Sequence, residues 1–175
     1  MTTGHNARLR NARKEFDNNS TPVQRWSFFA AISLGLLMIG LDNSILFTAL
    51  PTLTEELHAG DTQQLWIINA YPLVLLLGTG TLGDKIGHRR MFTTGLVIFG
   101  MASLAAAFSP SPAFLIAARA LLGLGAAVMM PATLALIRLT FTNEQERNTA
   151  IGIWGSVAVV GAAAGPVVGG ALLEV

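Results

Sequence analysis

The sequence contains no cysteine, and only 12% of its 175 residues are charged. Without cysteine there is no disulfide framework, no thiol nucleophile and no cysteine-ligated metal site. A soluble domain of this size carries about 25% charged residues, so roughly half of the usual charge is missing. The formal net charge is +1, and no basic patch is interleaved with aromatic residues, so nothing indicates nucleic-acid binding. The three histidines, His5, His58 and His88, lie in the tail or in connections, away from any nucleophile. The sequence therefore predicts neither an enzyme nor a metal site.

Apolar residues make up 52% of the chain and gather in five long segments. Each segment is close to the roughly 20 residues that a hydrocarbon core of about 30 Å requires. The segments cover residues 26–50, 65–82, 91–108, 113–137 and 149–173. Residues 1–25 are polar and too mixed for the start of a signal peptide, so we expect a cytoplasmic tail. The prediction is an all-α, multi-pass membrane protein in which residues 26–175 form a helical transmembrane bundle.

The basic residues indicate which side of the membrane each connection occupies. If the N-terminus is cytoplasmic, ten of the eleven Lys and Arg residues fall on the cytoplasmic side, as Lys and Arg in short loops generally do. They are Arg8, Arg10, Arg13, Lys14, Arg25, Lys85, Arg89, Arg90, Arg138 and Arg147. The first outer connection, residues 51–64, contains acidic residues and no Lys or Arg. We therefore predict a cytoplasmic N-terminus.

The connection between the second and third segments has an unusual composition. It reads Gly80-Thr-Leu-Gly-Asp-Lys-Ile-Gly-His-Arg-Arg90, with glycine at 80, 83 and 87 and an acid at Asp84. A loop that only anchors the chain on the cytoplasmic side needs its basic residues and none of these others. Such a loop is typical of helices that slide against one another, which favours a transporter.

Two ionisable residues, Asp42 and Arg119, lie well inside the apolar segments. Each costs about 2.5–3.5 kcal/mol to insert, so each is expected to face the bundle interior with a partner. At 1.5 Å per residue, Asp42 lies about 24 Å from the cytoplasmic end of its segment and Arg119 roughly 10 Å from its outer end. In a core of about 30 Å these depths allow the two side chains to meet. One interpretation is a static ion pair. The other is that Asp42 takes up and releases a proton while Arg119 competes for the carboxylate.

Small residues mark the fourth and fifth segments as close-packed. Gly123 and Gly125 follow Arg119, and Gly161, Gly165 and Gly169 recur every four residues in the fifth segment. Such spacing lets a neighbouring helix backbone approach closely. Pro166 removes a backbone donor and predicts a bend there, which either reflects ordinary packing or seals and opens a cavity.

Four stretches in the right order together resemble the major facilitator superfamily, in particular its fourteen-helix drug:proton antiporters. The stretches are Leu41 to Pro51 (LDNSILFTALP); Gly80, Leu82, Asp84, Gly87, Arg89 and Arg90; Arg119, Gly123, Gly125 and Ala126; and Gly161, Gly165, Pro166, Gly169 and Gly170. The segment from Gln63 to Tyr71 is also similar to bacterial exporters of quaternary ammonium compounds. The superfamily fold consists of two six-helix halves with the substrate between them near the midplane. The resemblance therefore implies that residues 26–175 are the first five helices of such a fold, an incomplete N-terminal half.

The resemblance also implies roles for individual residues. Asp42 and Arg119 would couple transport to protons. The loop residues Gly80, Gly83, Asp84, Gly87, Arg89 and Arg90 would form a cytoplasmic gate, and Gly161, Gly165, Pro166, Gly169 and Gly170 would restrict leak through the cavity. Asn69 and Tyr71 would face the substrate; some cation exporters carry an acid where this chain has Asn69.

The implied function is proton-coupled export of drugs or toxic lipophilic cations across the bacterial inner membrane. The proton gradient would drive it without a cofactor. The expected partners are the lipid bilayer, protons, a cationic amphipathic small molecule and the remaining helices of the same transporter. Two alternatives stay open: an exporter of an endogenous metabolite, and a truncated membrane protein without transport activity.

Overall fold

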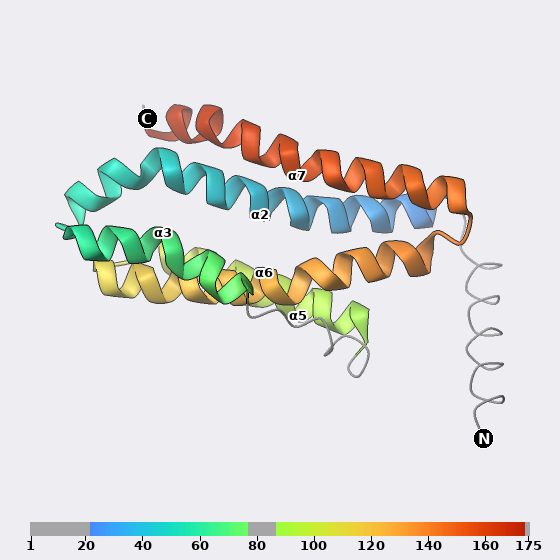
Figure 1. Ribbon diagram of the computed structural model, residues 1–175, viewed down its shortest axis with the longest axis horizontal. Helices are drawn as coiled ribbons and strands as arrows, with labels where there is room; N and C mark the ends of the chain where they lie inside the picture. The colour runs from blue at the N-terminus through green and yellow to red at the C-terminus, as the bar shows by residue number, and fades with distance from the viewer. Residues whose placement is uncertain (1–21, 77–86, 174–175) are drawn as a thin grey trace, which may run out of the picture.

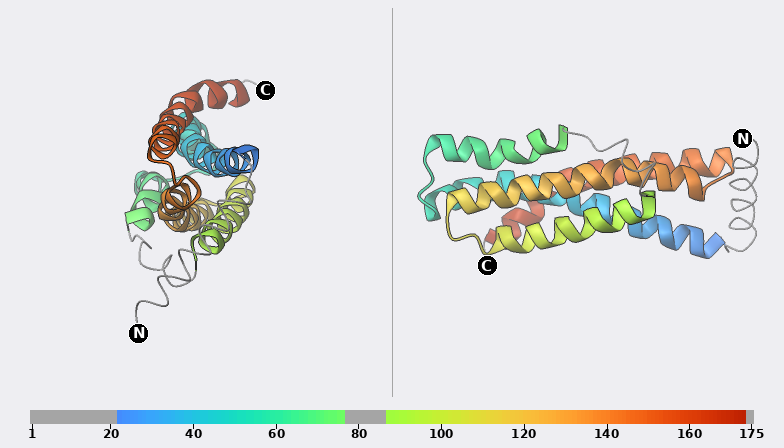
Figure 2. Two further views of the ribbon diagram at one scale, coloured as in Figure 1. Left: turned by 90° about the vertical axis from the view of Figure 1, so that its right-hand side faces the viewer. Right: turned by 90° about the horizontal axis from the view of Figure 1, so that it is seen from below.

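The computed structural model describes residues 22–76 and 87–173, which form five helices and no strand. The helices are α2 (Pro22–Glu56), α3 (Asp61–Leu76), α5 (His88–Ala107), α6 (Pro112–Thr140) and α7 (Glu144–Leu173). They lie along a common long axis and alternate in direction, as the two further views also show (Figures 1 and 2). The predicted all-α helical bundle is confirmed.

Several helices are longer than the predicted apolar segments and extend into the polar residues that flank them. The first helix runs to Glu56, where the prediction ended it at Leu50, and the last begins at Glu144 instead of Thr149. Side chains cap two of the starts: the Ser111 hydroxyl accepts from the Phe114 amide, and the Asn143 carbonyl oxygen accepts from the Gln145 amide. The long apolar segments therefore predict where the helices lie. They do not predict where the helices end, because polar capping groups outside the apolar segments set the ends.

Four of the described helices are long and apolar enough to span a membrane: Pro22–Glu56, His88–Ala107, Pro112–Thr140 and Glu144–Ala171. The described part of α3 has 16 residues. The predicted second segment, residues 65–82, continues from there into residues that lie outside the described ranges.

The alternating course of the helices sorts the charges between the two ends of the bundle. The described arginines other than Arg119 lie at the start of α2, α5 and α7 or the end of α6; they are Arg25, Arg89, Arg90, Arg138 and Arg147. The acidic residues Glu55, Glu56 and Asp61 lie at the opposite end, where α2 gives way to α3 (Figure 1). Glu144 and Glu146 share the arginine end, so it is the basic residues that gather at one end, as they generally do on the cytoplasmic side.

Packing divides the five helices into two groups. Helix α6 packs along α5 and α3, and α2 packs along α7, whereas α2 touches α6 and α3 much more sparsely (Figure 1). At the α5–α6 contact, a Cβ on Gly125 would lie 2.8 Å from the Phe99 amide nitrogen, so only glycine fits. The two groups are therefore α3–α5–α6, with α6 at its centre, and the α2–α7 pair.

Large apolar side chains cover the outside of both groups. Examples are Leu34, Met38 and Phe47 on α2, Val97, Met101 and Leu104 on α5, and Val159, Val160 and Val167 on α7. Such extensive apolar surface is a liability in water and the normal state in lipid. The exposed surface therefore agrees with a bundle that lies in a bilayer.

Candidate functional site

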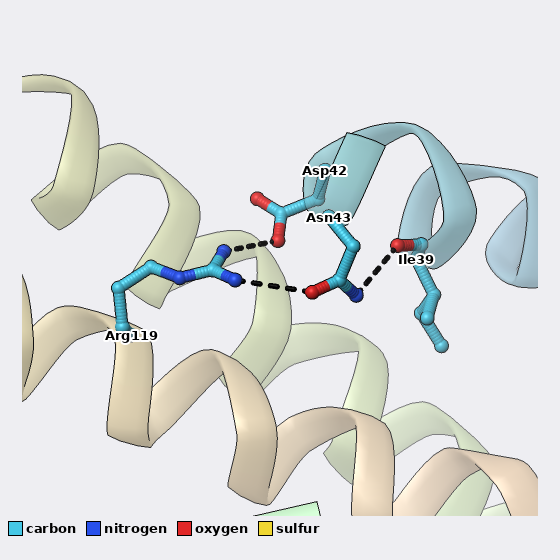
Figure 3. Close-up of polar contacts among 4 residues, drawn as sticks. All are labelled: Ile39, Asp42, Asn43 and Arg119. Atoms are coloured by element: carbon cyan, nitrogen blue, oxygen red, sulfur yellow. Dashed lines mark hydrogen bonds and ion pairs between the residues drawn. The ribbon is translucent and has the colours of Figure 1, made fainter. Parts of the chain in front are cut away.

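The structure brings Asp42 of α2 and Arg119 of α6 into direct contact (Figure 3). The Arg119 Nη1 donates to the Asp42 Oδ2 at 2.6 Å. The Arg119 side chain is 3% exposed and the Asp42 side chain 20% exposed, so the pair is largely removed from the surface. A buried charge-assisted hydrogen bond of this length is among the strongest polar contacts that a protein makes. It joins the two helix groups.

Asn43 supplies the guanidinium with a second oxygen. The Arg119 Nη2 donates to the Asn43 Oδ1 at 3.1 Å, and the Asn43 Nδ2 donates to the Ile39 carbonyl oxygen at 3.2 Å (Figure 3). The second bond leaves the Asn43 carbonyl oxygen facing Arg119 and its amide group facing the helix backbone. Sequence reasoning missed Asn43, although an amide next to the only acid of an apolar segment was a usable signal.

Tyr71 of α3 covers the same guanidinium with its ring. The Arg119 Cζ lies 4.9 Å from the ring centroid, within the range of a cation–π contact. A Cβ on Gly123 would lie 2.5 Å from the Tyr71 carbonyl oxygen, so this glycine allows α3 to approach α6 at the required distance. Gly123 thus faces α3 and Gly125 faces α5, which explains two glycines so close together after Arg119.

Asn69, the other predicted substrate-facing residue, does not join this cluster. It is exposed, and its Nδ2 donates to the Leu65 carbonyl oxygen of its own helix at 2.7 Å. The structure therefore separates Asn69 from Tyr71, which is 2% exposed.

A cavity of about 290 Å³ extends from the charge pair toward the end of the bundle where α2 gives way to α3. Asp42 and Arg119 line its inner part, and Glu56 and Ser109, at the ends of α2 and α5, line its outer part. Ile45, Leu46, Ala49, Leu53, Leu57, Ala106, Ala107, Leu115 and Leu122 form the remaining wall. Among the described residues no cluster of His, Asp or Glu is suited to a metal ion.

The predicted glycine groove of the fifth segment faces α2, and we call this contact the α2–α7 seam. A Cβ on Gly161 or Gly169 would come close to Leu37, Gly40 and Thr48, and one on Gly165 would collide with Ser44. The Ser44 hydroxyl donates to the Ala162 carbonyl oxygen at 2.6 Å. Gly170 has open space around it and takes no part.

The predicted gate loop is described only at its end. Gly80, Gly83 and Asp84 lie outside the described residues. Gly87 precedes α5 with φ 95°, a left-handed conformation that favours glycine. Arg89 and Arg90 follow in the first turn of α5 and are exposed.

Helix spans, a buried charge pair between two helix groups and a glycine seam together define a multi-pass helical membrane bundle. The family model of the Major Facilitator Superfamily matches residues 32–175, and the chain belongs to this superfamily.

The chain is similar to an efflux pump and to two resistance proteins. It is 46% identical over 157 residues to the multidrug efflux pump LfrA of Mycolicibacterium smegmatis. The aligned region covers 88% of this chain and 31% of the relative. It is 47% identical over 154 residues to the methyl viologen resistance protein SmvA of Salmonella typhimurium, covering 86% and 31%. The puromycin resistance protein pur8 of Streptomyces alboniger is 42% identical over 155 residues, covering 86% and 31%. The chain thus spans about a third of the length of these relatives.

Proposed function

We propose that these residues are the N-terminal helices of a proton-coupled exporter of drugs or toxic lipophilic cations in the bacterial inner membrane. The proposal follows the names of the relatives, which include a multidrug efflux pump and resistance proteins for methyl viologen and puromycin. The observation that carries proton coupling is the contact between Asp42 and Arg119. It is an acid in an apolar bundle, within reach of a cavity and paired with one fixed cation.

The charge pair has the right magnitude to act as a switch. Removing the charge of one partner of a buried ion pair costs about 3–5 kcal/mol. Moving a two-state equilibrium from 1:99 to 99:1 requires about 5.5 kcal/mol. Binding of one proton to Asp42 therefore supplies a large part of the free energy that changes the arrangement of α2–α7 against α3–α5–α6.

The cavity supplies the proton route. Its outer part lies at the end of the bundle that carries Glu56, and its inner part reaches the Asp42 carboxylate. An exporter that releases its substrate outside must take up its proton there, so a path to this acid from the outer end suits antiport. The proton gradient is the driving force, and no cofactor takes part.

The remaining motif residues receive supporting roles. The seam keeps α7 against α2 and restricts leak through the substrate cavity. The loop residues Gly80, Gly83, Asp84, Gly87, Arg89 and Arg90 act as the cytoplasmic gate. The substrate site lies between these helices and the other half of the transporter, whose helices are the partners of this bundle.

The test is efflux of a fluorescent lipophilic cation from energised cells that express the full reading frame containing these residues. We expect efflux that an uncoupler abolishes and that Asp42→Asn removes at unchanged expression. Met101→Leu, on the exposed face of α5, is the matched control.

Each failure has a distinct meaning. Uncoupler-sensitive efflux that survives Asp42→Asn removes Asp42 from the proton path. A protein that exports no such cation but exchanges protons for a metabolite replaces the drug assignment with a metabolite exporter.

A further inference from the structure

We infer that Asn43 and the Tyr71 ring form a second seat for the Arg119 guanidinium, which holds this cation when Asp42 carries a proton. The inference rests on the proposed proton coupling and names two positioning residues for it. Neither touches the proton; both act through Arg119.

The need for such a seat follows from the burial of Arg119. A guanidinium stays charged under all physiological conditions. The Arg119 side chain is 3% exposed, so where it stands solvent alone compensates little of its charge when its carboxylate partner becomes neutral. An uncompensated buried cation is strongly destabilising, and the protonated form of Asp42 would then be hard to reach.

Among residues 22–76 and 87–173, no other acid near Arg119 can replace the carboxylate. The titratable groups that interact with Asp42 are Arg119 from α6 and Tyr71 from α3. By sequence, residues 65–76 of α3, 91–107 of α5 and 150–173 of α7 contain no Asp, Glu, Lys or Arg. Glu56 lines the same cavity, but at its outer part. Compensation must therefore come from neutral groups that already touch the guanidinium.

Asn43 meets this requirement because its carbonyl oxygen is already aimed. The Asn43 Oδ1 accepts from the Arg119 Nη2 at 3.1 Å, while the Asn43 amide is held by the Ile39 carbonyl oxygen (Figure 3). Neither bond involves the Asp42 carboxylate. Both can therefore persist after protonation, and each contributes more then, because the guanidinium no longer shares its charge with the competing carboxylate.

Tyr71 meets the requirement with its ring. The guanidinium carbon lies 4.9 Å from the ring centroid, and the Tyr71 side chain is buried. Its hydroxyl lies near Asn43 but makes no well-formed hydrogen bond within the part of the chain that the structure describes. The contact to Arg119 thus comes from the aromatic face, so Phe should replace Tyr71 far better than Leu does.

The first measurement is the pH dependence of cation efflux by the full-length protein in proteoliposomes. Asn43→Leu removes the carbonyl oxygen at similar size, and Tyr71→Leu removes the ring. Each is expected to lower the proton affinity of the site about tenfold, which moves the half-maximal pH for transport about one unit toward acid. Tyr71→Phe should shift it less than Tyr71→Leu, and Met101→Leu is the basal control. Unshifted profiles for both leucine variants would overturn the inference.

The second measurement does not depend on transport. Asp42→Asn imitates the protonated carboxyl group, because it keeps a carbonyl oxygen and loses the charge. In that background Arg119 depends on the second seat, so Asn43→Leu and Tyr71→Leu should lower the melting temperature in detergent more than they do beside an intact Asp42. Equal losses in both backgrounds would refute the seat. Coupled transport that persists in Asp42→Asn would instead refute the proposed function and leave this result intact.

Discussion

Ser44 and Pro166 should be energetically coupled, because the serine completes a hydrogen bond that the proline removes. In an α-helix the amide of residue 166 would donate to the carbonyl oxygen of residue 162, and proline has no amide hydrogen. The Ser44 hydroxyl donates to this Ala162 oxygen across the seam at 2.6 Å. A backbone oxygen without a donor is costly in lipid, so this contact is more than ordinary close packing.

The expected magnitude follows from the two ways in which the carbonyl can be satisfied. Hydrogen bonds between membrane helices average about 0.6 kcal/mol and reach about 1.7 kcal/mol. An acceptor left buried without a donor costs about 1–3 kcal/mol. Ser44→Ala should therefore destabilise the protein by about 1–2 kcal/mol. In a Pro166→Ala background the new amide hydrogen satisfies Ala162, and Ser44→Ala should cost less than about 0.5 kcal/mol.

The assay is a double-mutant cycle on the purified full-length protein, with unfolding in mixed micelles followed by loss of helicity. Ser156→Ala is the matched control, since its hydroxyl bonds to the Gly152 carbonyl oxygen of its own helix at 2.9 Å. The cycle should give a coupling of about 1 kcal/mol for Ser44 with Pro166 and none for Ser156 with Pro166. Additive effects of Ser44 and Pro166 would refute the reasoning.

Three further predictions concern the contacts around the site. Gly165→Ala should sharply lower the yield of folded protein, because its Cβ would collide with Ser44. Gly100→Ala should be tolerated, because Gly100 has open space around it. Gel filtration of the solubilised protein measures the yield of both variants. Gly123→Ala should displace the Tyr71 backbone and move the pH profile of efflux toward acid, as we expect for loss of the Tyr71 ring. Ala49→Cys, on the cavity wall, should react with an impermeant thiol reagent added outside; reaction only from the cytoplasmic side would contradict the proposed proton route.

The sequence could predict the depth of the two site residues along their helices. Helical rise and membrane thickness place Asp42 and Arg119 at similar heights, and the structure joins them at 2.6 Å. The spacing of Gly161, Gly165 and Gly169 likewise identified a close-packed face. These quantities depend on position along a single helix, so a linear sequence records them directly.

The identity of each neighbour could not be read in the same way. The groove on α7 packs against α2, and the two glycines after Arg119 serve different helices, α3 and α5. Which helix occupies a face depends on the rotation of every helix about its axis, and many small-residue stripes fit one another. Asn43 and Ser44 were missed for this reason, since each acts on a helix distant in sequence.

Close packing in the α2–α7 seam indicates which helices of this bundle can shift against one another. Gly161 brings α7 against the backbone of α2, Gly165 and Gly169 pack on Ser44 and Thr48, and Ser44 adds a hydrogen bond. These two helices are therefore expected to move as one body. Helices α5 and α6 are locked in the same way through Gly125. The sparser contact lies between the two groups, and the Asp42–Arg119 bond crosses it. In the proposed mechanism a proton on Asp42 would thus act at the interface with the least packing to resist it, where a few kcal/mol suffice to change which arrangement is populated.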